Sequence, residues 1–199
     1  MDKTLIFAVI AIRTVTRRLR RLVSGLGWGA VLCLVLGQPA FADSAAVIDA
    51  GVKDTLALFE KEVPGGEDFL DDAAGVLVFP KVIKGGFGIG GEYGEGALKV
   101  GRKTVDYYST VAASIGFQFG VQAKAVVIVF TTKDALKQFR ASDGWKAGVD
   151  GSVAIAEWGA GDNINTLEEQ SPVVGFIISN KGFMYNLTLE GSKFSRIER

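Results

Sequence analysis

The side chains of this sequence that could do acid–base chemistry are carboxylates. The chain has no histidine and a single cysteine, Cys33, which excludes a Ser-His-Asp triad, a histidine base and a zinc site built from histidines and cysteines. The remaining candidates are Glu92, Glu95 and Asp150. In an extended strand Glu92 and Glu95 point to opposite faces, so they form no acid–base pair. We therefore expect no catalytic residues, no metal site and no cofactor; a carboxylate-based hydrolase is the alternative.

Between residues 75 and 120, glycines alternate with large side chains. In an extended segment the two-residue period places Phe87, Ile89 and Tyr93 on one face and five glycines on the other. These glycines are Gly86, Gly88, Gly90, Gly94 and Gly96. Because glycine is costly in strands, the bare face indicates a sharp bend or the close approach of a helix, another strand or a ligand. For this face alone we favour packing on the N-terminal helix.

Basic residues flank the glycine segment at both ends, and lysine or arginine beside an anionic membrane contributes on the order of 1 kcal/mol each. If the glycine face admits an acyl chain or lipid backbone, these cations could meet the lipid phosphates. The candidate lipid-binding residues are Lys81, Lys84, Gly86, Gly88, Gly90, Lys99, Arg102 and Lys103.

Two helices are predicted around these segments. Apolar residues recur every three or four positions from Ser44 to Glu62, with Asp43 or Ser44 as N-cap and Pro64 after the end. The polar face of this helix is mainly acidic. After a short acidic turn, Glu67 to Asp72, the chain is mostly strand until Thr131, where the spacing of a capping box predicts a short helix from Lys133 to Ala141. Leu136 and Phe139 lie on its inner side.

The strands are predicted from alternation and from apolar runs. The run AVVIVF, residues 125–130, predicts a strand covered on both faces, and alternating patterns predict strands near residues 115–121 and 145–155. Residues 159–172 read as a loop, and 173–179 with 183–189 read as a hairpin. We predict a single α+β domain with a strongly curved or barrel-like, mostly antiparallel sheet of about seven strands, an N-terminal helix and one inserted short helix.

Residues 1–42 have the pattern of a secretory signal peptide. Arginines at positions 17, 18, 20 and 21 precede an apolar run, residues 25–37, and the sequence Ala40-Phe41-Ala42 is a cleavage signal. We predict cleavage after Ala42, a domain of residues 43–199, and a periplasmic or envelope-associated location. A second apolar patch precedes Val15, so we hypothesise that translation starts there and that residues 1–14 are an artefact.

Cleavage changes the charge of the chain. The whole sequence has 22 basic and 22 acidic residues. Removing residues 1–42 takes away six basic residues and one acidic residue, which leaves 16 against 21 and a net charge of −5. We expect no nucleic-acid partner, because non-specific binding to nucleic acid needs a basic surface on a larger scale.

Three segments resemble the SYLF lipid-binding domain family, which occurs in bacterial envelope proteins and in eukaryotic membrane-trafficking proteins. They are GVLVFPKVIKGGFGIGGEYGEGAL, GFQFGVQAKAVVIVF and GFMYNLTLEGSKFSRI, and the similarity spans residues 45–197. The resemblance implies a non-catalytic module that binds phospholipid or an anionic membrane surface in the bacterial envelope. Eukaryotic relatives are understood to bind phosphoinositides partly through a basic N-terminal segment, and the acidic helix departs from that pattern. A purely structural envelope protein is a further alternative.

Overall fold

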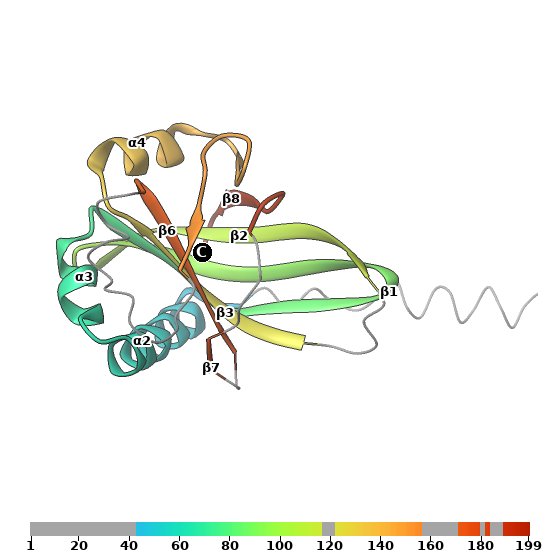
Figure 1. Cartoon of the computed structure of the whole chain (residues 1–199), viewed down its shortest axis with the longest axis horizontal. Coiled ribbons are helices and arrows are strands. Elements are labelled where there is room, and N and C mark those ends of the chain that lie inside the picture. The colour runs from blue at the N-terminus through green and yellow to red at the C-terminus, as the bar shows by residue number, and fades with distance from the viewer. Residues whose placement is uncertain (1–42, 117–121, 157–170, 180–181, 184–188) are drawn as a thin grey trace, which may run out of the picture. The chain divides into compact units, whose positions relative to one another are not determined.

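The structure is a computed structural model that describes residues 43–116, 122–156, 171–179, 182–183 and 189–199, with the backbone alone for 86–89, 114–116, 179 and 182–183. Asp43–Arg199 form one compact unit, in which a curled sheet has helices on both faces (Figure 1). The predicted signal peptide lies outside the described residues. Within the described part of the chain, no helix has both the length and the apolar character to cross a membrane.

The described residues form three helices, α2 (Ala45–Glu62), α3 (Gly66–Asp72) and α4 (Lys133–Ala141). The hydroxyl of Ser44 accepts a hydrogen bond from Val47 N at 3.4 Å and caps α2. Thr132 caps α4 in the same way. Both helices were predicted. The turn predicted at 67–72 is wrong, because Gly65 adopts a positive φ of 77° and the chain then starts a new helix.

The sheet has eight strands in the order β4-β8-β2-β1-β3-β6-β5, with β7 paired to β6. Their bounds are β1 Gly75–Val100, β2 Lys103–Gly116, β3 Gln122–Phe130, β4 Trp145–Lys146, β5 Ala154–Ile155, β6 Val173–Ser179, β7 Gly182–Phe183 and β8 Lys193–Ile197. All pairings between these strands are antiparallel except β5 with β6. The predicted α+β class and curved, mostly antiparallel sheet are therefore confirmed.

Strand β1 folds back on itself. A Cβ atom added to Gly94 would lie 2.8 Å from the carbonyl oxygen of Lys81, and one added to Gly96 would overlap that of Val78. In a single straight strand Val78 and Gly96 would be about 60 Å apart. The two halves of β1 therefore pass beside each other, the first paired with β3 and the second with β2 (Figure 1).

The bare glycine face thus meets another strand at Gly94 and Gly96. Our preference for packing on the N-terminal helix is wrong there, because the first half of β1 fills the space. Helix α2 comes close to the sheet at a different glycine: a Cβ on Gly51 would lie 2.8 Å from Cβ of Pro80.

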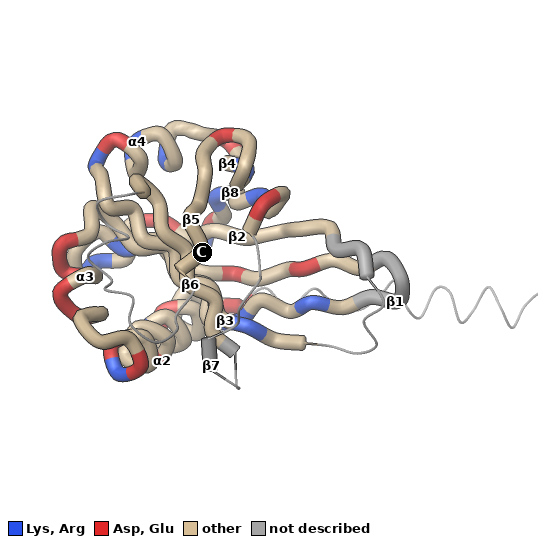
Figure 2. Tube along the Cα trace, in the orientation of Figure 1, with Lys and Arg blue, Asp and Glu red and all other residues tan. Residues whose placement is uncertain are grey.

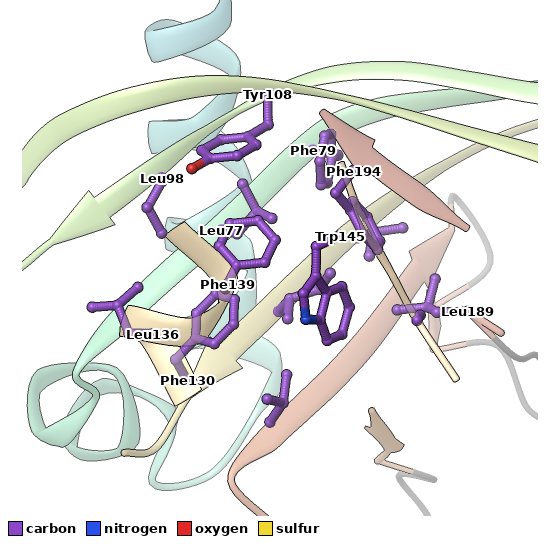
Figure 3. Packing of buried hydrophobic residues seen from close by; sticks show 14 of the residues in the cluster. Leu77, Phe79, Leu98, Tyr108, Phe130, Leu136, Phe139, Trp145, Leu189 and Phe194 are labelled. Atoms are coloured by element: carbon purple, nitrogen blue, oxygen red, sulfur yellow. The ribbon is translucent and has the colours of Figure 1, made fainter. Parts of the chain in front are cut away.

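Each face of the sheet carries its own hydrophobic core. The α2-side core consists of Ile48, Val52, Phe59, Val63, Phe69, Val76, Val78, Ala97, Val127, Val129, Ala156, Val174, Phe176 and Ile178. The α4-side core consists of Leu77, Phe79, Val82, Leu98, Tyr108, Val126, Ile128, Phe130, Leu136, Phe139, Trp145, Ala147, Val173, Ile177, Leu189 and Phe194 (Figure 3). Neighbours along β1 and β3 alternate between the two cores, as expected for strands buried on both faces.

The predicted strand at 145–155 is wrong in its middle. The chain turns after β4, where the carbonyl of Lys146 accepts hydrogen bonds from the backbone N of Val149 and Asp150. The first strand of the predicted hairpin is present as β6, and the start of its second strand is present as β7. The rest of that second strand, residues 184–188, lies outside the described residues. So do residues 117–121 and most of the predicted loop. Strand β8 was not predicted as a separate strand.

We expect Gly96→Ala to lower the free energy of unfolding by at least 1–3 kcal/mol, since the added methyl group would overlap a backbone oxygen that cannot move without shifting β1. The measurement is urea unfolding of residues 43–199. Gly85→Ala is the matched control, because a Cβ there meets nothing within 4 Å, and it should be neutral or slightly stabilising. Equal effects of the two substitutions would show that the fold-back is not tightly packed.

Candidate functional site

A basic pocket lies between α4 and β8. It is a hollow of about 360 Å³ lined by Lys133, Leu136, Lys137, Arg140, Ala141 and Arg196, and we call it the α4–β8 pocket. Three of its four cations succeed one another at spacings of four and three residues along α4, which places them on one helix face. The fourth, Arg196, comes from β8.

Packing inside the α4-side core positions these cations. Phe139 is 1% exposed, and its ring centroid lies 4.9 Å from those of Tyr108 and Phe130 and 5.7 Å from that of Trp145. These contacts fix the rotation of α4 about its axis (Figure 3). The opposite face of α4, with its lysines, is therefore held toward solvent.

Asp106 on β2 joins the two arginines of the pocket. Its Oδ2 lies 3.0 Å from Nη2 of Arg140, and its Oδ1 lies 3.5 Å from Nε of Arg196. Arg196 also donates from Nη2 to the carbonyl of Arg140 at 3.3 Å. One carboxylate thus contacts two guanidinium groups, and the positive charge of the pair is further reduced by Asp143, which interacts electrostatically with Arg196.

The lysines add to that charge. Lys133 and Lys137 are exposed and have no ion-pair partner among the residues that the structure describes. Like charges at this spacing on a helix cost a few tenths of a kcal/mol. The pocket therefore combines two ion-paired guanidinium groups with two exposed ammonium groups, a donor set suited to a phosphate or another small anion.

Tyr108 lies beneath Arg196. The guanidinium carbon of Arg196 is 6.0 Å from the centroid of the Tyr108 ring, within cation–π range. Burial raises the pKa of the Tyr108 hydroxyl, and the neighbouring guanidinium group of Arg196 offsets part of that effect. That hydroxyl is fully buried and makes no hydrogen bond of good geometry with the described residues, although the guanidinium group of Arg196 is its polar neighbour.

The helices on the two sides of the sheet differ in charge, although acidic residues also lie beside α4, β4 and β8 (Figure 2). Helices α2 and α3, on one face, contain eight acidic and two basic residues. On the other side, α4, β4 and β8 contain six basic residues and one acidic residue. The turns beside these elements add Asp143, Asp150 and Glu190, so this side has a modest excess of positive charge within a domain of net charge −5.

The structure places the sequence-predicted lipid-binding cations in two groups. The first group is Lys81 and Lys84 on β1. Nζ of Lys84 lies 3.5 Å from Oε1 of Glu92, whose Oε2 also lies 2.7 Å from Nζ of Lys124. Lys81 is exposed on the same strand. Along an extended strand, Glu92 and Lys99 are about 20 Å apart. One membrane contact would therefore not use both groups equally.

The second group faces acidic neighbours. Lys99 and Arg102 line a hollow of about 290 Å³ together with Glu60, Glu67 and Asp71 of α2 and α3. Lys103 is exposed, and Gly90 is half-buried on β1. The surroundings of Gly86 and Gly88 lie outside the described residues. A lipid-binding role of these residues stays a prediction.

The three candidate catalytic carboxylates have separate partners. Oε1 of Glu95 lies 2.5 Å from Nη2 of Arg199 and accepts from the hydroxyl of Tyr93 at 2.6 Å. Burial alone would raise the pKa of Glu95, but these two hydrogen bonds and the charge of Arg199 outweigh it and hold the pKa below its usual value. Asp150 accepts from the backbone N of Lys146 at 2.7 Å in a turn. A carboxylate held ionised in this way is a poor general acid.

Sequence reasoning missed the α4–β8 pocket. The spacing of Lys133, Lys137 and Arg140 opposite Leu136 and Phe139 was a readable signal for a basic helix face. Asp106 and Arg196 gave no such signal, because strand pairing far along the chain brings them together.

Comparison with known families is consistent with the sequence resemblance. Residues 111–198 match the model of the Ysc84 family, described as Las17-binding protein actin regulator. This match confirms the SYLF resemblance over residues 111–198, whereas the glycine-rich segment 75–98 lies outside the matched range. No curated protein matches the chain. The matched range contains all the residues that line the α4–β8 pocket.

We expect Tyr108→Phe to leave the free energy of unfolding unchanged or to raise it by up to about 1 kcal/mol, because it removes a buried hydroxyl that makes no hydrogen bond of good geometry while the ring packing stays. Chemical denaturation of residues 43–199 measures this. Arg196 should stay stacked on the phenylalanine ring. A loss of about 1 kcal/mol or more would mean that the hydroxyl has a partner in the folded protein.

Proposed function

We propose that this chain, whose residues 111–198 belong to the Ysc84 (SYLF) family, is a non-catalytic module that binds anionic phospholipid at the bacterial cell envelope through its α4–β8 pocket. The single observation that carries the proposal is the excess of positive charge at this pocket in an otherwise acidic domain.

The chemistry of the pocket suits a phosphate headgroup. Arg140 and Arg196 are oriented by Asp106 before any ligand arrives, so little side-chain entropy is lost when they bind. Lys133 and Lys137 lie at the rim and can adjust to the oxygens that they meet. The excess charge does not depend on which headgroup carries the phosphate.

The separation of charge favours one orientation at a membrane. An anionic surface attracts α4 and β8 and repels α2 and α3, so the domain approaches with the pocket first. Because the whole domain is acidic, we expect weak binding that falls as salt shortens the Debye length, which is about 10 Å at 0.1 M.

Export of the chain is a part of the proposal. Support comes from the signal-peptide pattern of residues 1–42 and from the compact unit, which begins at Asp43, the first residue that cleavage after Ala42 would leave. We place the domain in the periplasm or against the envelope.

The alternatives have less support. A carboxylate-based hydrolase needs a carboxyl group free to exchange a proton, and Glu92 and Glu95 are engaged with cations. In a purely structural protein, the mutual repulsion of three cations on one face of α4 would cost stability without any benefit. A third alternative is a module that binds protein, because the family description names a protein, Las17, as the binding partner. A module that binds only protein would not bind lipid vesicles.

The test is co-sedimentation of residues 43–199 with vesicles of neutral lipid and of neutral lipid mixed with an anionic phospholipid, at low and moderate salt. We expect binding only to anionic vesicles. Replacing Lys133 and Lys137 with glutamine should weaken it by up to about 2 kcal/mol, or roughly 30-fold, since each lysine contributes on the order of 1 kcal/mol.

Two further variants make the test specific. Replacing Lys53 and Lys61 of α2 with glutamine changes the net charge by the same amount on the acidic face, and should leave binding nearly unchanged. Replacing Lys99, Arg102 and Lys103 with alanine tests the sequence-predicted cluster. If only that variant loses binding, the α4–β8 pocket is not the site.

A further inference from the structure

The first and last described residues of the chain meet at one buried carboxylate. The side chain of Glu95 is 5% exposed and accepts from Arg199 and Tyr93 at Oε1. At Oε2 it accepts from the backbone N of Asp43 at 3.1 Å. Asp43 precedes Ser44, the cap of α2, so this contact lies where the helix is joined to the sheet.

Cleavage after Ala42 would change the chemistry of that nitrogen. In the uncleaved chain it is a neutral peptide amide with one hydrogen. When a peptidase hydrolyses the bond, water supplies a hydroxyl to the Ala42 carbonyl carbon and a hydrogen to the Asp43 nitrogen, and at neutral pH the new amine takes up a proton. Because Glu95 is ionised, the hydrogen bond from the neutral amide is already charge-assisted. Cleavage adds a full positive charge on the donor, which turns this hydrogen bond into an ion pair.

We propose that removal of residues 1–42 creates an ion pair between the α-ammonium group of Asp43 and the carboxylate of Glu95, and that this pair locks α2 onto β1. The inference rests on the proposed cleavage after Ala42, and not on lipid binding. Processing then does more than free the domain from its leader, because it completes a structural contact.

The charges at the site favour such a pair. The carboxylates of Glu95 and Asp43 face the guanidinium group of Arg199, which interacts with both. The α-ammonium group adds a second positive charge to this cluster, and the low exposure of Glu95 limits screening by solvent.

The dipole of α2 determines whether the α-ammonium charge of Asp43 stabilises or destabilises the domain, and this can be tested. A positive charge beside a helix N-terminus is unfavourable, because the macrodipole is positive at that end. Without Glu95, the free α-ammonium group of Asp43 should therefore destabilise α2. With Glu95 present, the same group should stabilise the domain.

The experiment compares two forms of residues 43–199, one with a free α-amine on Asp43 and one acetylated there, each in the wild type and in Glu95→Gln. Both hydrophobic cores lie within these residues, so they fold without the leader. At pH 6.5 we expect acetylation to lower the Tm of the wild type by about 3 °C or more, where about 1 kcal/mol corresponds to 2–4 °C. In Glu95→Gln, acetylation should leave the Tm unchanged or raise it. Equal Tm values for the two wild-type forms would overturn the proposal.

A second measurement applies even if Glu95→Gln does not fold. The rate at which a reagent acylates the α-amine of the wild type, followed against pH, gives its pKa. An ion pair with Glu95 predicts a pKa above the ordinary range of about 7.7–8.0 for this group, and a value within or below that range contradicts it. The intact mass of the exported protein checks the premise, because a start other than Asp43 would refute this inference while vesicle binding still tests the proposed function.

Discussion

The contact between the two halves of β1 is the constraint on which the rest of the domain depends. Gly94 and Gly96 let one backbone pass against the other where any side chain would collide. This close approach lets the sheet curl, and the curl gathers aromatic rings from β1, β2, β3 and β8 on one side. Phe139 of α4 fills the space between them. The glycines therefore determine where the basic helix face is presented, although they lie far from it along the chain.

The helices on the two sides of the sheet differ in charge. Acidic α2 and α3 cover one face, and basic α4, with β4 and β8, belongs to the other. Had the same residues been mixed over the surface, they would have formed many weak exposed ion pairs, each worth little. Their separation gives the domain a direction in an electric field instead, which is the property that a module docking on a charged surface needs.

Local features of this chain were predictable from the sequence, and long-range contacts were not. Ser44 and Thr132 cap helices because of the three or four residues that come directly after them, and the apolar run in β3 reveals its own burial. In contrast, the atom that a Cβ on Gly96 would meet is the carbonyl oxygen of Val78, in the first half of β1. The two-residue alternation in the sequence predicted a strand face without side chains, but it did not predict which segment packs against that face. The partners of Glu95 and Asp106 likewise come from distant segments, so neither cluster has a sequence motif.

The position of β3 has a consequence for how the chain folds. Its residues 126–130 are buried, and it lies between β1 and β6. β1 is synthesised before β3, but β6 does not begin until Val173. During that interval residues 126–130 of β3, which are uncharged and mostly β-branched, have an unpaired edge. Segments of this composition tend to pair with other chains. Because closing a long loop must precede this pairing, the last strand to protect β3 arrives late and slowly. The chain is therefore most prone to aggregate as a nascent intermediate.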